Sequence, residues 1–256
     1  MSKPDEKTSK FKIVFKTKEQ IRGFREPLNR IGFASGVGII LNINENEIKV
    51  NAVSDTNNIL GQVVMKVSSV CESIEIDGEV DVGILEYENF LSCFEMFESE
   101  FEIEFDGERF IFQDKNNTSK LEFFSTRPDT IQHCSDVTPK KFGTSFVDFT
   151  LKLKNIQKIV KAFSILGEDL LKISSNEKEK KLDISIANKG KSNSYSFSID
   201  YDKAPSQSFE MFYSHDHLMN LFKCNSDMDI SITEKALMST VCNDQYSIRY
   251  YISRRS

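Results

Sequence analysis

The sequence has no tryptophan, and histidine and proline are sparse, with three and five residues in 256. No apolar run approaches the roughly 20 residues that a membrane-spanning helix needs, so we expect no membrane partner. Phenylalanine, by contrast, occurs 21 times, and we expect it to dominate the core. With 39% apolar and 28% charged residues, the composition is that of a globular protein with one large or two ordinary domains.

The cysteines form no metal or redox motif, because no two of the five are separated by the two residues of a C-x-x-C pair. The first ten residues are polar and charged, without the apolar segment of a secretory signal. We therefore expect reduced thiols in a cytosol-like compartment rather than a disulfide framework. The cysteines are Cys71, Cys93, Cys134, Cys224 and Cys242.

Three short patterns look like functional motifs but lack what the chemistry requires. His215-Asp216-His217 opens a predicted helix, where aspartate is favoured for capping and for the helix dipole, so this pattern predicts no metal site. His133-Cys134 has no asparagine or aspartate partner for a catalytic dyad, and Gly36-x-Gly38 lacks the last glycine of a phosphate-binding loop. Since no spacing of carboxylates selects an acid–base pair, we predict no enzyme, no metal and no cofactor. The patterns are His215-Asp216-His217, His133-Cys134 and Gly36-x-Gly38.

Most of the chain alternates apolar and polar residues, which is typical of antiparallel strands with one buried and one solvated face. Such segments cover residues 11–15, 101–105, 182–186, 195–199, 228–232 and 246–252. Asp106-Gly107 predicts a hairpin turn between two of them. Residues 44–46 and 177–181 give weaker hairpin signals.

Four segments follow a helical period instead, at residues 18–31, 86–98, 154–166 and 214–224. Thr17 and Gln20 have the spacing of a capping box at the start of the first. Pro27 predicts a kink or an early end in the same helix. Ser214 is a candidate N-cap for the fourth.

The two halves of the chain share this order of elements, which indicates a duplicated α+β unit. In each half an alternating strand leads at once into a helix, and strands, a second helix and a final pair of strands follow. We predict a disordered tail at 1–10, domains at 11–125 and 146–256, and a connector at 126–145 that contains Pro128 and Pro139.

The opening helix of each half carries cations at the same spacing. In the second half, Lys154, Lys158 and Lys161 fall within one sector, opposite the apolar residues of the helix. In the first half the corresponding residues are Lys18, Arg22 and Arg25, with Arg30 beyond them and Glu19 and Glu26 between them. Each stripe alone reads as a solvated face. Its repetition in a chain of net charge −6 favours a local surface for a polyanion, held through its phosphates.

The duplicated plan with basic opening helices resembles that of the DNA sliding clamps. It is most similar to the two-domain clamps, namely proliferating cell nuclear antigen and the polymerase processivity clamps of tailed phages. The resemblance spans residues 11–252 and rests on the order of elements rather than on one motif. It is carried by the helix at 18–32 running into 35–41, the second helix start at 85–91, the hairpin at 101–112 and the segment 248–252.

The resemblance implies a clamp fold of two topologically similar domains, each with antiparallel sheets outside and two helices on the inner face. It further implies a homotrimeric ring that encircles double-stranded DNA without reading its sequence, is opened by a clamp loader and tethers a DNA polymerase. The protein would act inside the cell at replication sites, in the host cytoplasm for a phage or the nucleus for a eukaryote. The residues that would face DNA are Lys18, Arg22, Arg25, Arg30, Lys154, Lys158, Lys161 and Lys223.

In such clamps a partner peptide docks between the connector and a neighbouring sheet, which implies an exposed apolar patch here. The candidates are Ile59, Leu60, Ile131, Tyr250 and Ile252, each of which also reads as ordinary strand core. Two other functions stay open. One is a monomeric DNA-binding processivity factor of the same fold, and the other is a β-rich scaffold without a DNA role.

Overall fold

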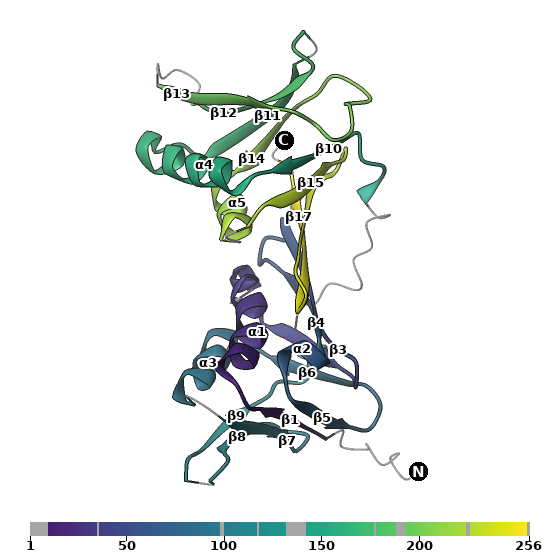
Figure 1. The fold of residues 1–256 in the computed structure, drawn as a ribbon, viewed down its shortest axis with the longest axis vertical. Coiled ribbons are helices and arrows are strands. Elements are labelled where there is room, and N and C mark those ends of the chain that lie inside the picture. Colours follow the sequence, from purple (N-terminus) through teal and green to yellow (C-terminus); the bar gives the residue numbers. More distant parts are fainter. Residues whose placement is uncertain are drawn as a thin grey trace. The chain divides into compact units, whose positions relative to one another are not determined.

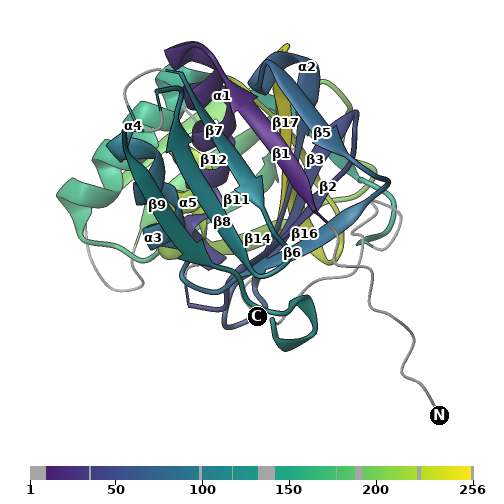
Figure 2. The same cartoon turned by 90° about the horizontal axis from the view of Figure 1, so that it is seen from below.

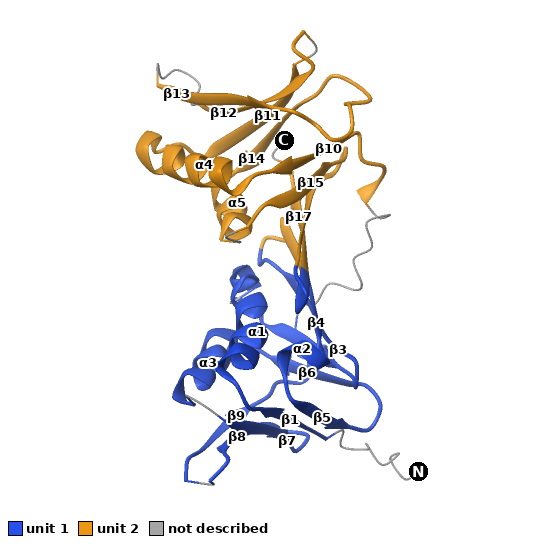
Figure 3. Ribbon diagram, viewed as in Figure 1, with its two compact units in different colours: residues 1–55, 62–135, 243–247 blue, residues 56–61, 136–242, 248–256 orange. Residues whose placement is uncertain are grey.

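The structure is a computed structural model that describes residues 10–34, 36–97, 100–116, 118–131, 142–176, 178–187, 193–223 and 226–254. The chain forms two compact units, which Figure 3 shows in blue and orange. The first unit comprises residues 1–55, 62–135 and 243–247, and the second comprises 56–61, 136–242 and 248–256. Each unit includes a short segment from the other half of the chain, because β4 (Ile59–Lys66) and β17 (Tyr246–Ser253) each contribute residues to both units. The predicted tail at 1–10 lies almost wholly outside the described residues.

The first unit contains a five-stranded antiparallel sheet with the order β5-β1-β7-β8-β9, visible in Figure 2. Its strands are β1 (Phe11–Phe15), β5 (Ser73–Ile76), β7 (Phe101–Phe105), β8 (Arg109–Asp114) and β9 (Lys120–Phe124). A second group of strands has the order β4-β3-β2-β6, with β2 (Ile39–Ile43), β3 (Glu47–Val53) and β6 (Val80–Ile84). The helices of the first unit are α1 (Lys18–Asn29), the short α2 (Val67–Val70) and α3 (Tyr87–Cys93) (Figure 1). Helix α3 continues as a 3-10 turn over Phe94–Met96.

The predicted turns and helix start of this unit are confirmed. Gly107 adopts a φ of 106°, and the Asp106 carboxylate accepts hydrogen bonds from the backbone of Glu108 and Arg109 at 3.0 Å each. Both bonds of the capping box between Thr17 and Gln20 are present at the start of α1. Pro27 lies inside α1, and the helix ends two residues later at Asn29, in agreement with the predicted early end.

Phenylalanine rings in stacked and edge-to-face contacts fill the space between α1, α3 and the five-stranded sheet. Phe94 lies at the centre of this cluster, with its ring 5.2 Å from that of Phe24 on α1 and 5.3 Å from that of Phe112 on β8. It also contacts Phe15 at 6.1 Å and Phe101 at 5.9 Å between ring centroids. Aromatic pairs of this kind add stabilisation beyond their buried area, so the cluster fixes both helices on one face of the sheet.

The second unit repeats this arrangement with mostly aliphatic side chains. One group of strands has the order β10-β15-β16-β17, with β10 (Val147–Leu151), β15 (Met228–Ile232) and β16 (Ala236–Cys242). The other is a four-stranded sheet with the order β13-β12-β11-β14, made of β11 (Leu170–Asn176), β12 (Lys181–Ala187), β13 (Ser194–Ile199) and β14 (Glu210–Ser214). The helices are α4 (Leu153–Leu166) and α5 (His215–Phe222). Ser214 occupies the N-cap position of α5, as predicted. Its side chain makes no capping hydrogen bond with the backbone of the helix.

The strand orders of the two units correspond, except that β5 of the first unit has no counterpart in the second. The order β1-β7-β8-β9 matches β10-β15-β16-β17, and β4-β3-β2-β6 matches β13-β12-β11-β14. The opening strand and helix also keep the same spacing, since Lys18 follows Phe11 by as many residues as Lys154 follows Val147. Within the described residues, no helix combines the length and apolar character needed to cross a bilayer.

The start of the segment after β9 is fixed on the edge strand β6. Thr126 forms an antiparallel bridge with Gly83, with its backbone N–H 2.8 Å from the glycine carbonyl oxygen. A Cβ atom at position 83 would lie 2.3 Å from the Thr126 carbonyl oxygen and 2.9 Å from Cδ1 of Ile131. Only glycine therefore allows this close approach.

We predict that Phe94→Ala lowers the free energy of unfolding by about 3–5 kcal/mol, because it empties the centre of the aromatic cluster. Met96→Ala is the matched control, since this side chain of the same 3-10 turn is 67% exposed and should cost little. Urea denaturation followed by far-ultraviolet circular dichroism measures both, and equal losses would contradict the assignment of the core.

Gly83→Ala should destabilise the chain by about 1–3 kcal/mol, because the new methyl group overpacks the bridge to Thr126. Gly32→Ala is the control, because a Cβ atom there meets no heavy atom within 4 Å. Thermal unfolding of the two variants checks this, and a neutral Gly83→Ala would show that the bridge yields easily.

Candidate nucleic-acid interface

The lysine stripe of the second unit is the set Lys154, Lys158 and Lys161 on α4. All three side chains are exposed, while Ile156, Ile159 and Phe163 of the same helix are buried. With 3.6 residues per turn, lysines spaced by four and three residues share one face. Burial of the apolar face therefore fixes the lysine stripe outward.

The lysine stripe is free of internal ion pairs within the described part of the chain. The N-cap residue of α4, Lys152, behaves differently, because its Nζ lies 3.0 Å from the carboxylate of Asp227. The same carboxylate accepts a hydrogen bond from the backbone N–H of Leu153 at 2.8 Å, which secures the first turn of α4. That hydrogen bond, followed by the contact with Lys152, lowers the pKa of Asp227 below its usual value.

The first basic stripe is the set Lys18, Arg22 and Arg25 on α1. Lys18 and Arg22 are exposed, with 81% of the Arg22 side chain accessible, whereas only 24% of the Arg25 side chain is accessible. Arg25 reaches toward the turn that follows α3 and pairs with Glu95, with Nη2 2.5 Å from the carboxylate oxygen. Arg22 lies 3.6 Å from the carboxylate of Glu26.

Arg30 is largely buried and does not lie on this exposed surface, so its contact with DNA stays a prediction that its placement does not support. Only 11% of its side chain is accessible, it pairs with Glu26, and its guanidinium lies over the ring of Tyr246 at 5.9 Å. Burial disfavours ionisation of Glu26, but the hydrogen bond and charge of Arg30 outweigh it and keep the pKa of this carboxyl below its usual value. Arg30 therefore serves the internal packing of the first unit.

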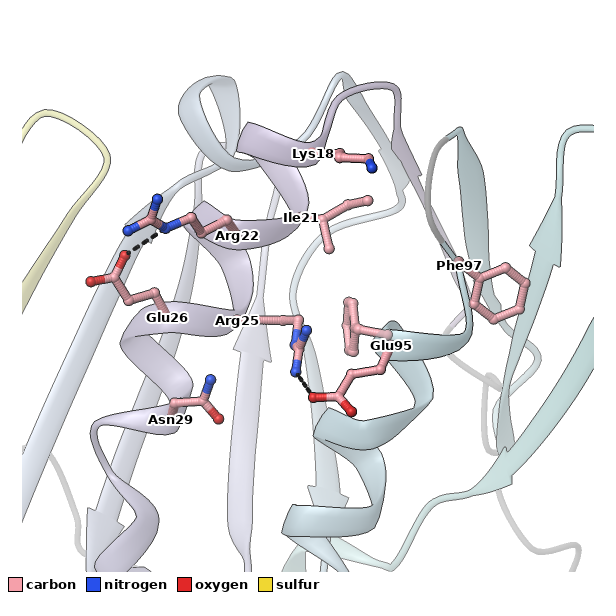
Figure 4. Close-up of a pocket in the computed structure, with 9 residues that line it drawn as sticks. Lys18, Ile21, Arg22, Arg25, Glu26, Asn29, Glu95 and Phe97 are labelled. Carbon is pink, nitrogen blue, oxygen red and sulfur yellow. Dashed lines mark hydrogen bonds and ion pairs between the residues drawn. The ribbon is translucent and has the colours of Figure 1, made fainter.

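A groove of about 630 Å³ lies between α1 and the turn after α3. Figure 4 shows the first basic stripe along it, with the Arg25–Glu95 and Arg22–Glu26 pairs as dashed lines. Three cations and two carboxylates thus share this surface, so the first stripe is largely neutralised, unlike the lysine stripe. The lining residues are Lys18, Ile21, Arg22, Arg25, Glu26, Asn29, Phe94, Glu95 and Phe97.

The second helix of each unit adds little positive charge. The outward residues of α3 and its 3-10 turn include Glu88, Asn89 and Met96. Lys223, just beyond α5, is exposed, as the sequence suggested. On α5 the ring of His215 packs against Phe163 at 4.6 Å. Across the described residues, no three histidine, cysteine or acidic side chains are grouped to hold a metal ion.

The apolar candidates for a partner peptide do not form an exposed patch. Ile59, Ile131, Tyr250 and Ile252 are all buried. Three of them lie on β4 and β17, whereas Ile131 follows the 3-10 turn over Pro128–Thr130 and packs beside Gly83. Leu60 is half-buried. The expectation of exposure is therefore wrong for four of the five. His133, Cys134 and the middle half of the predicted connector, residues 132–141, lie outside the described residues.

Sequence reasoning missed two features of this surface. Glu95 lies 70 positions from Arg25 along the chain, and no local pattern links them. Ile165 is 70% exposed on α4, one turn beyond Lys161 and in line with the lysine stripe. The repeat could have indicated that Ile165 is exposed, because the polar and exposed Asn29 occupies the corresponding place on α1.

Comparison with known proteins gives a likeness in structure without one in sequence: no family model and no curated protein sequence matches the chain. The proliferating cell nuclear antigen of Entamoeba histolytica superposes with a TM-score of 0.76 at 13% identity, covering 96% of this chain and 99% of that one. The antigen of A. fulgidus, solved with the C-terminal region of FEN-1 bound to it, gives 0.74 at 13% identity over 96% and 98%. A PCNA2–PCNA3 complex from Sulfolobus tokodaii gives 0.70 at 13% identity over 95% and 99%. The chain therefore has the α+β fold of the DNA sliding clamps over nearly its whole length.

Proposed function

We propose that the protein is a DNA sliding clamp, a non-enzymatic processivity factor that encircles duplex DNA and tethers a polymerase. The observation that carries this proposal is the lysine stripe of α4, which lacks an internal ion pair within the described residues and repeats the position of the first basic stripe. In a chain of net charge −6, three such lysines on one helix face form a local surface suited to a phosphate backbone.

Contacts of this type suit sliding rather than fixed binding. Lysine side chains neutralise phosphates without reading base edges, so every register along the duplex has nearly the same energy. Each contact is also weakened by salt, which keeps the barrier between neighbouring registers low. A closed ring would then retain the DNA topologically even though the individual contacts are weak.

Self-association into a homotrimer is supported by two open sheet edges. Among the edge strands in the described residues, β9 of the first unit pairs only with β8, and β13 of the second unit pairs only with β12. Phe124 on β9 is 68% exposed, which is unusual for a side chain of this size. Exposed edge strands readily pair with another chain, so β9 of one copy and β13 of the next are the proposed contacts.

Binding of partner proteins is proposed by analogy with the fold. The solved A. fulgidus structure holds the C-terminal region of FEN-1, and a polymerase and a clamp loader would use a comparable peptide contact here. Because four of the five apolar candidates are buried, such a peptide would need other side chains, or a local rearrangement at Ile131 and Leu60. The protein would act at replication sites.

Neutralising the lysine stripe with Lys154→Gln, Lys158→Gln and Lys161→Gln should weaken binding to a non-specific fluorescent duplex. The negative slope of log K against log salt should become shallower by about 2.7, because each lost phosphate contact removes about 0.9 from its magnitude. The control variant carries Lys178→Gln, Lys180→Gln and Lys181→Gln, with the same charge change at the tip between β11 and β12. Equal effects of the two triple variants would overturn the proposed interface.

Native mass spectrometry should give a mass three times the 29.4 kDa of one chain. Phe124→Asp should shift this assembly to monomers, whereas Ile165→Asp, at an equally exposed apolar residue on α4, should leave it intact. Retention on circular DNA with loss from linear ends would accompany the trimer. A concentration-independent monomer that holds linear DNA would instead identify the monomeric processivity factor.

A further inference from the structure

The two opening helices differ in what their cations do, although they occupy equivalent places in the fold. On α4 the lysine stripe makes no ion pair within the described residues. On α1, Arg25 pairs with Glu95 and Arg22 pairs with Glu26, and only Lys18 of that stripe lacks such a pair in the described chain. The two helices therefore cannot offer equal positive charge to a polyanion.

The Arg25–Glu95 pair occupies the groove between α1 and the turn after α3 (Figure 4). The Glu95 side chain is largely exposed, while the guanidinium of Arg25 is drawn inward, with its Nε buried and without a hydrogen-bond partner among the described residues. Arg25 thus presents its charge to the groove wall while one of its donors is unused. The carboxylate, by contrast, is free to swing into solvent.

A carboxylate and a backbone phosphate bind a guanidinium in the same way, through oxygen atoms that accept from its planar N–H groups. Exposed ion pairs of the Arg25–Glu95 kind are weak and exchange readily. A phosphate that enters the groove would therefore compete with Glu95 for the same donors.

We propose that Glu95 is a built-in competitor of DNA at Arg25, so that a backbone phosphate binds in this groove only by displacing the Glu95 carboxylate. This proposal rests on the proposed function and specifies how its two helices share the duplex. The lysine stripe of α4 provides most of the attraction to the DNA phosphates. The first basic stripe attracts them less strongly, because its own acidic partners compete for its arginines. The weak first stripe keeps the total attraction low enough for movement along DNA.

Glu95→Gln tests the proposal in the full chain, with a fluorescent non-specific duplex titrated at several salt concentrations. The variant should bind more tightly than the unmodified protein, and its slope of log K against log salt should steepen by about 0.9, the value of one added phosphate contact. Glu88→Gln is the matched control, because it removes the same charge from an exposed residue of α3 that makes no ion pair within the described residues. The control should leave the slope unchanged.

A double variant separates competition at Arg25 from a general change in charge. If a phosphate takes the place of Glu95 on Arg25, then Arg25→Met combined with Glu95→Gln should lose the added contact and return to the original slope. Equal steepening by Glu95→Gln and Glu88→Gln, or a gain that persists without Arg25, would overturn the proposal. An unchanged Glu95→Gln slope while the lysine-stripe variant loses binding would overturn this proposal alone. Absence of binding of the unmodified protein to both the linear duplex and circular DNA would overturn the proposed function as well.

Discussion

Burial of one apolar face on each opening helix is the constraint from which the surface of this protein follows. Phe24 of α1 packs in the phenylalanine cluster, and Ile156 and Phe163 of α4 are buried in the second unit. Once these faces are buried, helical geometry leaves no choice about where the intervening cations point. The candidate interface is thus a by-product of core packing and needs no binding partner to set it.

The same fold is stabilised by different means in the two units. The first relies on interleaved aromatic rings and on carboxylates that hold its arginines. The second relies on aliphatic side chains and leaves the lysine stripe of α4 solvated. Arginine suits the first role because its planar guanidinium can pair with an acid and stack on a ring, as Arg30 does with Glu26 and Tyr246. Arginine therefore serves internal packing in the first unit, whereas lysine presents positive charge to solvent on α4 of the second unit.

Local signals in the sequence were sufficient for the helix starts, the hairpins and the duplicated order of elements. The Thr17 capping box and the Asp106-Gly107 turn depend on neighbouring residues, so the chain reveals them without a structure. What escaped prediction depends on residues far apart in sequence. Glu95 beside Arg25, the inward placement of Arg30 and the burial of the apolar docking candidates all require knowledge of which segments meet in space.

The contact between Asp227 and the first turn of α4 has a consequence for biosynthesis. The backbone donor of Leu153 is satisfied by a carboxylate 74 positions later in the chain. During translation this helix leaves the ribosome well before its stabilising partner, so its first turn stays incompletely bonded until β15 has followed. The first turn of the helix that carries the lysine stripe therefore gains its side-chain partner only after the chain has been synthesised as far as Asp227.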